Sequence, residues 1–130
     1  MDRRAIYAGK PVEGAPYSPG IQWDQLVFVS GQIHMDPVTG TVLRDDFEGA
    51  VKLCLENVER ILNAAGTDLR HCLKVTVFLA DMNNFARLNV VYNTFFGTLK
   101  PARSCIQVAR LPLDADVEIE AIAVLPSEEV

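Results

Sequence analysis

Basic charge is scarce in this sequence and never forms a long run. The 130 residues include 12 Lys and Arg against 17 Asp and Glu, which leaves a net charge of −5. Two basic residues are adjacent at Arg3-Arg4, and no basic stripe follows them. Because binding to nucleic-acid phosphates needs clustered Lys and Arg, nucleic acid is not an expected partner.

Cysteine is also sparse, at Cys54, Cys72 and Cys105. An odd number of widely spaced cysteines does not make a disulfide framework, so we expect reduced thiols. The cysteines and the two histidines have no metal-ligand spacing, which predicts no metal. The sequence also lacks a glycine-rich phosphate loop, so no nucleotide cofactor is expected.

Long apolar runs are missing as well. No stretch approaches the roughly 18 apolar residues that span a bilayer, and the first residues lack the apolar core of a signal peptide. We therefore expect a cytoplasmic protein without a membrane partner. A hydrophobic content of 49% with 22% charged residues is typical of a globular chain. Without a repeat, low-complexity stretch or linker, residues 1–130 are expected to form a single domain.

The clearest periodicity predicts a helix over residues 46–65. Asp45 is a suitable N-cap, Glu48 follows as in a capping box, and Gly66 can end the helix in a left-handed conformation. Apolar residues recur there at helical spacing: Phe47, Ala50, Val51, Cys54, Val58, Ile61, Leu62 and Ala65.

A second helix is expected around residues 85–95, with Asp81 or Asn83 as its cap and Gly97 as its stop. Its apolar stripe consists of Phe85, Leu88, Tyr92 and Phe95.

Runs of β-branched and aromatic residues predict strands at 26–30, 72–80, 103–109 and 117–125. The first run is expected to end at Gly31, with a tight turn at 36–40. The order of strands and helices predicts an α+β fold, a mixed sheet with two helices packed on one face.

Charged residues stand on two of these apolar strands. Alternation puts Arg103 and Cys105 on one face of their strand, and Glu118 and Glu120 together on one face of theirs. Surface or interface ion pairs are the commoner explanation of such residues. The functional interpretation is that the Arg fork grips a small carboxylate while a Glu orients water.

Sequence blocks along nearly the whole chain resemble those of the Rid (YjgF) family of reactive-intermediate deaminases. The C-terminal blocks are Pro101-Ala102-Arg103-Ser104-Cys105, Val108-Ala109-Arg110-Leu111-Pro112 and Val117-Glu118-Ile119-Glu120-Ala121-Ile122-Ala123. Upstream blocks include Pro16-Tyr17-Ser18, Val29-Ser30-Gly31-Gln32-Ile33, Asp36-Pro37 with Thr39-Gly40, Asn57-Val58, Ala64-Ala65-Gly66, Lys74-Val75-Thr76-Val77-Phe78, and Asn89 with Tyr92.

This resemblance implies a chorismate-mutase-like α+β domain that forms a homotrimer with its sites between subunits. It implies cofactor-independent hydrolysis of 2-imino and 2-enamino acids, such as 2-aminoacrylate, 2-iminopropanoate and 2-iminobutanoate, to 2-keto acids and ammonia. Arg103 would bind the substrate carboxylate and Glu118 would orient the hydrolytic water. The other matching pocket positions are Tyr17, Ser30, Gly31, Asn89 and Cys105.

Several alternatives stay open at this point. One is a specialised deaminase of a larger enamine, of the aminomuconate or pyrimidine-catabolic type. Others are a ribonuclease-like or chaperone-like translation inhibitor, and a non-catalytic module that binds small carboxylates. Ala15 and His34 depart from the family's frequent Gly and Pro near the expected pocket mouth, which bears on substrate size. Cys105 is expected to line the pocket, because neither His34 nor His71 stands in a partner motif for a nucleophile.

Overall fold

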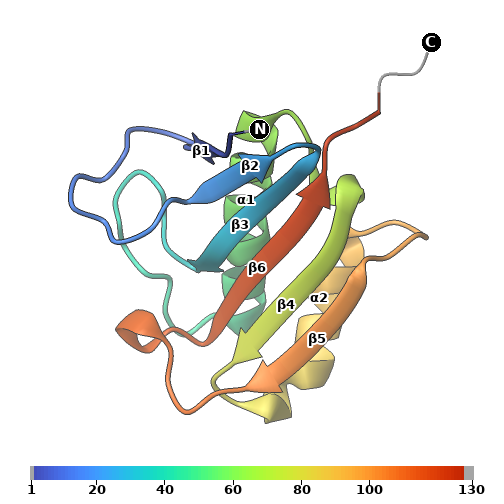
Figure 1. Cartoon of the computed structure of the whole chain (residues 1–130). Coiled ribbons are helices and arrows are strands. Elements are labelled where there is room, and N and C mark those ends of the chain that lie inside the picture. Colours follow the sequence, from blue (N-terminus) through green and yellow to red (C-terminus); the bar gives the residue numbers. More distant parts are fainter. Residues whose placement is uncertain (1, 128–130) are drawn as a thin grey trace.

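The computed structural model describes residues 2–127, which fold into one six-stranded mixed sheet with the strand order β1-β2-β3-β6-β4-β5 (Figure 1). Neighbouring strands are antiparallel except for the parallel pair β4–β5. The strands are β1 (Arg4–Ile6), β2 (Gly20–Trp23), β3 (Leu26–Ile33), β4 (Cys72–Leu79), β5 (Ala102–Gln107) and β6 (Val117–Val124). The predicted α+β class is confirmed.

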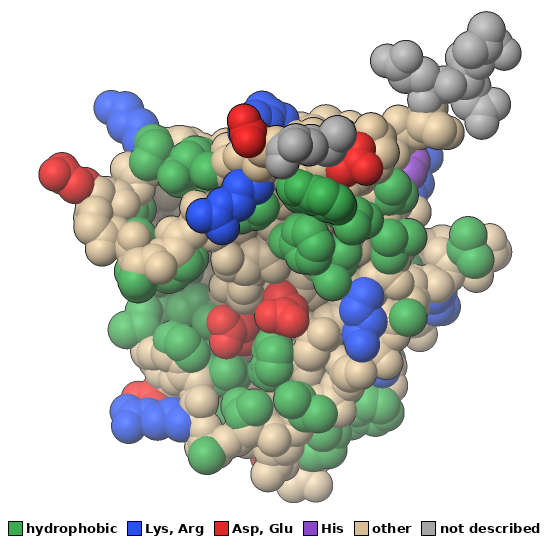
Figure 2. Space-filling model, viewed as in Figure 1, with side chains coloured by type: hydrophobic (Ala, Val, Ile, Leu, Met, Phe, Trp, Pro, Cys, Tyr) green, Lys and Arg blue, Asp and Glu red, His purple; other side chains and the backbone are tan. Residues whose placement is uncertain are grey.

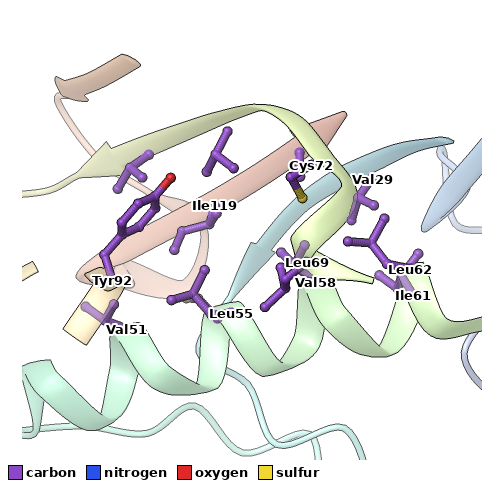
Figure 3. Close-up of a cluster of buried hydrophobic side chains, with 14 of the residues drawn as sticks. Val29, Val51, Leu55, Val58, Ile61, Leu62, Leu69, Cys72, Tyr92 and Ile119 are labelled. Carbon is purple, nitrogen blue, oxygen red and sulfur yellow. The ribbon is translucent and has the colours of Figure 1, made fainter. Parts of the chain in front are cut away.

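Two helices, α1 (Phe47–Ala65) and α2 (Phe85–Phe95), cover the same face of the sheet (Figure 1). The apolar stripe of α1 packs on β3 and β6, where strand residues that face the helix are fully buried. Figure 3 shows this core, with Leu55, Val58 and Leu62 of α1 below Ile119 and Val29 of the sheet. Its burial is the main source of stability for the fold.

The ends of α1 differ slightly from the prediction. Asp46 is the N-cap, and its carboxylate accepts a hydrogen bond from the Gly49 N–H, whereas Asp45 has a φ of 59°. Glu48 does not complete a capping box; its carboxylate binds Arg87 in α2 at 2.7 Å. Gly66 ends the helix with a φ of 94°, as predicted.

The first predicted strand is longer in the structure than in the prediction, because it does not end at Gly31. β3 continues to Ile33 through a β-bulge at Ser30 and Gly31, where the register shifts between Val29 and Gln32. Such a bulge bends the strand and redirects its side chains. The predicted turn is confirmed, with a hydrogen bond from the Gly40 N–H to the Asp36 carbonyl.

The segment before α2 also refines the prediction. Asp81 caps a short 3-10 helix, Met82–Asn84, by accepting from the Asn83 N–H. α2 follows directly and ends at a cap on Phe96 instead of Gly97. Leu88 and Tyr92 are its buried residues, while Phe85 is partly exposed.

The sheet face opposite the helices is open (Figure 1), and Figure 2 shows hydrophobic side chains on it around a group of acidic ones. The exposed large apolar residues include Phe28 of β3, Leu73 of β4 and Ile106 of β5. Patches of this kind usually mark an interaction surface. Within residues 2–127, no helix is both long and apolar enough to cross a membrane.

Candidate active site

The first pocket lies at the bulged end of β3, and we call it the Glu118 pocket. β2 pairs with residues 26–29 of β3, so within residues 2–127 the rest of that edge is not covered by a strand. The pocket has a volume of about 290 Å³. Its lining consists of Tyr17, Gly31, Gln32, Ile33, Met35, Pro37, Asn57, Arg60, Pro112, Leu113 and Glu118.

Gly31 and Glu118 fit together in this pocket. The Glu118 carboxylate lies so close to the Gly31 backbone that a Cβ atom at Gly31 would collide with it. A larger residue at position 31 would therefore displace the Glu118 carboxylate. Glu118 is half-buried, and burial, followed by repulsion from Glu120, raises the pKa of its carboxyl. A carboxyl with a raised pKa is suited to exchanging protons near neutral pH.

The second pocket surrounds Arg103 and is called the Arg103 pocket. Arg103 donates from Nη1 to Asn89 Oδ1 at 2.9 Å, and its guanidinium lies 4.7 Å above the Tyr92 ring and 5.5 Å from the Phe85 ring. The two cation–π contacts and the hydrogen bond to the Asn89 amide hold the Arg103 guanidinium in place. The pocket, about 280 Å³ in volume, is lined by Asn89, Tyr92, Asn93, Lys100, Pro101 and Arg103.

The Arg103 guanidinium has an unusual set of partners for a half-buried cation. In residues 2–127, no carboxylate lies within ion-pair distance of it. Its one hydrogen-bond partner there is the neutral Asn89 amide. A positioned guanidinium without a carboxylate is a binding site for an external one.

The two pockets lie on opposite faces of the sheet. Arg103 pairs in register with Val75, which is buried beneath the helices, so it points to the helix face. Glu118 pairs with Phe78, three residues further along β4, and therefore points to the open face. A single chain does not bring Arg103 and Glu118 together.

Of the remaining predicted site residues, Tyr17 lines the Glu118 pocket, whereas Ser30 and Cys105 are not part of the lining of either pocket. Tyr17, 63% exposed, reaches the Glu118 pocket from the loop before β2. Ser30, on the bulge, ties that loop to β3 by donating from Oγ to the Ser18 carbonyl at 2.7 Å and from its N–H to the Pro19 carbonyl at 2.9 Å. Cys105 lies on the same side of β5 as Arg103, and burial raises the pKa of its thiol.

The structure adds pocket residues that the sequence analysis did not select. Asn57 is buried under the end of β3, and its Nδ2 donates to the carbonyls of Ile33 at 3.2 Å and Met35 at 2.9 Å. Arg60 lies one helical turn further along α1 in the same wall. Both residues belong to the polar positions of a predicted helix, and nothing in the sequence indicates that a pocket adjoins them.

The wall opposite these residues is the loop Pro112–Asp116. Leu113 and Asp114 both have a φ of 54°, in the left-handed region that disfavours side chains. Arg44 donates to both of their carbonyls, at 2.6 and 3.0 Å. His34, fully buried, accepts from the Asp116 N–H through Nε2 at 2.8 Å while Nδ1 lies 2.8 Å from the Leu43 carbonyl. These contacts hold the loop in its shape.

Across residues 2–127, no three His, Cys, Asp or Glu side chains are grouped to hold a metal ion. What the two pockets offer is a guanidinium fork and a carboxyl of raised pKa.

Known proteins share this fold and sequence. A family model described as Endoribonuclease L-PSP matches residues 8–125. A RutC family protein of Pyrococcus horikoshii is 47% identical over 116 residues, 89% of this chain and 90% of that protein. A 2-iminobutanoate/2-iminopropanoate deaminase of Salmonella typhimurium is 45% identical over 127 residues, 95% of this chain and 98% of that one.

Solved structures agree with these relatives. The structure of E. coli TdcF with bound serine superimposes with a TM-score of 0.86 at 42% identity, covering 95% of this chain and 99% of that one. A yeast structure, YEO7, gives a TM-score of 0.90 at 36% identity over 96% and 100% of the two chains. The blocks that span nearly the whole sequence, the sheet order and these matches have one explanation: the chain belongs to the Rid (YjgF) family.

Proposed function

We propose that this protein is a cofactor-independent cytoplasmic deaminase that hydrolyses reactive 2-imino and 2-enamino acids to 2-keto acids and ammonia. The observation that carries the proposal is Arg103, a positioned guanidinium that lacks a carboxylate partner in residues 2–127. A relative of 45% identity over 95% of the chain is named as such a deaminase, which supports the choice of substrate class. Short imino acids such as 2-iminopropanoate and 2-iminobutanoate are the first substrates to test.

We place the complete site between two subunits of a homotrimer. Because Arg103 and Glu118 lie on opposite sheet faces of one chain, they can act on one small molecule only if they come from different subunits. The apolar open face supports this arrangement, since association would remove its side chains from water. Tyr17, Gly31 and Ser30 would enter the site with Glu118, and Asn89 and Cys105 with Arg103.

The proposed chemistry needs few groups. A protonated imine is already electrophilic at C2, so water oriented by Glu118 can add there while the carboxyl takes the proton. Glu118 then returns that proton to the carbinolamine nitrogen. Ammonia leaves as the C–N bond breaks, the C2–O bond becomes a double bond, and the hydroxyl proton passes to the Glu118 carboxylate and on to the released ammonia. Arg103 holds the substrate carboxylate through both steps.

A trapping assay tests this proposal. An amino acid oxidase generates the imine in place, semicarbazide traps what remains, and the protein competes with the trap. Wild type should lower trapping, and Arg103→Ala should lose roughly 100-fold in kcat/KM because a charge-assisted contact is removed. Arg70→Ala is the matched control, since the Arg70 side chain is 79% exposed and lies outside both pockets. Unchanged trapping with wild type across short and long imines would refute the proposal.

RNA cleavage is the second candidate, because the matching family model is described as an endoribonuclease. The net charge of −5 opposes it. Phosphate contacts weaken steeply with salt, so RNA binding that falls sharply as salt rises would favour this candidate.

A further inference from the structure

Arg60 brings a cation into the Glu118 pocket. Two lining residues come from opposite sides of the sheet at the end of β3 that β2 leaves unpaired: Glu118 points to the open face, and Arg60 belongs to α1, the helix that covers the other face. Among residues 2–127, Arg60 is the one Arg or Lys in the lining of this pocket. The cavity of about 290 Å³ therefore has a carboxyl on one side of the sheet edge and a guanidinium on the other.

Arg60 is an exposed residue of α1, and its guanidinium donates hydrogen bonds to two neutral groups. Its Nη1 donates to Asn57 Oδ1 at 3.4 Å, and its Nη2 donates to the Ala8 carbonyl at 3.1 Å. Asn57 is itself fixed by its two bonds to the carbonyls of Ile33 and Met35, which line the same pocket. A guanidinium has five N–H donors, so most of its hydrogen-bonding capacity is left for a ligand.

The positive charge of Arg60 also has no ion-pair partner among residues 2–127. In residues 2–127, no carboxylate lies within ion-pair distance of its guanidinium. The pKa of Asp36 is lowered mainly by hydrogen bonds from the N–H groups of Thr39 and Val38. The charge of Arg60 is the smallest of the causes that lower it. Those two N–H groups donate to Asp36 Oδ1 at 3.0 and 2.8 Å.

We propose that Arg60 binds a second anionic group of the substrate, so that the enzyme prefers 2-imino or 2-enamino dicarboxylic acids over short alkyl imino acids. The inference rests on the proposed deaminase function. The reacting carbon would lie at Glu118, the first carboxylate would bind Arg103 of a second subunit, and the chain of the substrate would follow the pocket toward Arg60. A second carboxylate is disfavoured beside Glu118 by like charge, and Arg60 is the cation that shares this pocket with Glu118.

The test compares two substrates in the trapping assay. L-Glutamate oxidase supplies 2-iminoglutarate, and an amino acid oxidase acting on 2-aminobutanoate supplies 2-iminobutanoate. Arg60→Gln should lower kcat/KM for 2-iminoglutarate by roughly 10- to 100-fold, the effect of one charge-assisted contact, and leave 2-iminobutanoate unchanged. Arg60→Lys should retain part of the preference. Arg70→Gln, on an exposed Arg outside the pocket, should behave as wild type.

An equal loss on both substrates would overturn the inference, because Arg60 would then only anchor the segment at Ala8. The two proposals fail in different ways. If wild type hydrolyses neither imine, the deaminase proposal fails, and calorimetry with 2-oxoglutarate and 2-oxobutanoate decides the role of Arg60. Selective loss of 2-oxoglutarate binding in Arg60→Gln would uphold an anion site, and equal binding by both proteins would reject it.

Discussion

Two neighbouring residues, Gly31 and Glu120, determine the space around the Glu118 carboxyl and contribute to its raised pKa. Gly31 leaves the space it occupies on the open face, and Glu120, two residues along β6, adds a like charge. Burial is the larger cause of the raised pKa of Glu118, and Glu120 is the smaller one. Glu120 is exposed, so its side chain can be changed without opening the core.

Replacing Glu120 with Gln should shift the pH dependence of the enzyme. Without the neighbouring charge the ionised form of Glu118 becomes easier to reach, so the pKa of Glu118 falls. The acidic limb of the kcat/KM profile should then move to lower pH, with the plateau nearly unchanged. Lys52→Gln, an exposed change on α1, is the control. An unmoved limb would mean that Glu118 does not govern it.

The sequence made Arg103 and Glu118 candidate site residues through the resemblance to the Rid family, and each of them lines a pocket in the structure. It could not show that they face opposite sides of the sheet. Alternation orders residues within a strand, but the relative orientation of β5 and β6 follows from their pairing with β4. Arg60 could not be selected for a similar reason, because its pocket is made by segments distant in sequence.

Among the elements, the loop Pro112–Asp116 has the least favourable backbone. Two successive non-glycine residues in the left-handed region cost on the order of 1 kcal/mol each. Arg44 and His34 offset that cost from a segment far away in the chain. Strained loops that are held by several such contacts are common in active sites.

The contact between His34 and this loop should make stability depend on pH. Burial lowers the pKa of His34 from its usual 6.5. In the unfolded chain the ring takes up a proton below about pH 6.5, whereas the folded protein keeps it neutral to accept from the Asp116 N–H. Protonation therefore favours unfolding, so the contribution is complete above that pH and is lost as the pH falls further.

Urea unfolding of wild type and His34→Gln near neutral pH and near pH 5 measures this effect. Wild type should be more stable near neutral pH, by about 1 kcal/mol for the altered hydrogen bonds, and the difference should shrink in acid. A constant difference at all pH values would contradict the assignment of a neutral His34.

The predictability of the elements follows their length and pattern. α1 was predicted to within a residue, because a long amphipathic stripe ends at a glycine that can take a positive φ. β1 and β2 were not predicted, since Arg4–Ile6 and Gly20–Trp23 are short and lack an apolar run. The end of β3 was misplaced because a glycine read as a stop is instead part of a bulge that faces Glu118.

For the whole molecule, the central claim is that two subunits are needed to make one site. Each chain offers an Arg103 pocket beneath α2 and a Glu118 pocket at the edge of β3. The apolar open face provides a surface for association, and closed cyclic assembly would place the same two pockets together at every interface.

Subunit mixing tests this claim most directly. Arg103→Ala and Glu118→Ala chains are unfolded together in equal amounts, refolded, and assayed for imine hydrolysis beside each variant refolded alone. Random assembly pairs an intact Arg103 from one chain with an intact Glu118 from the other at about one quarter of the interfaces, so the mixture should recover about 25% of wild-type activity. A mixture no more active than the separate variants would show that the two residues do not form one site across subunits.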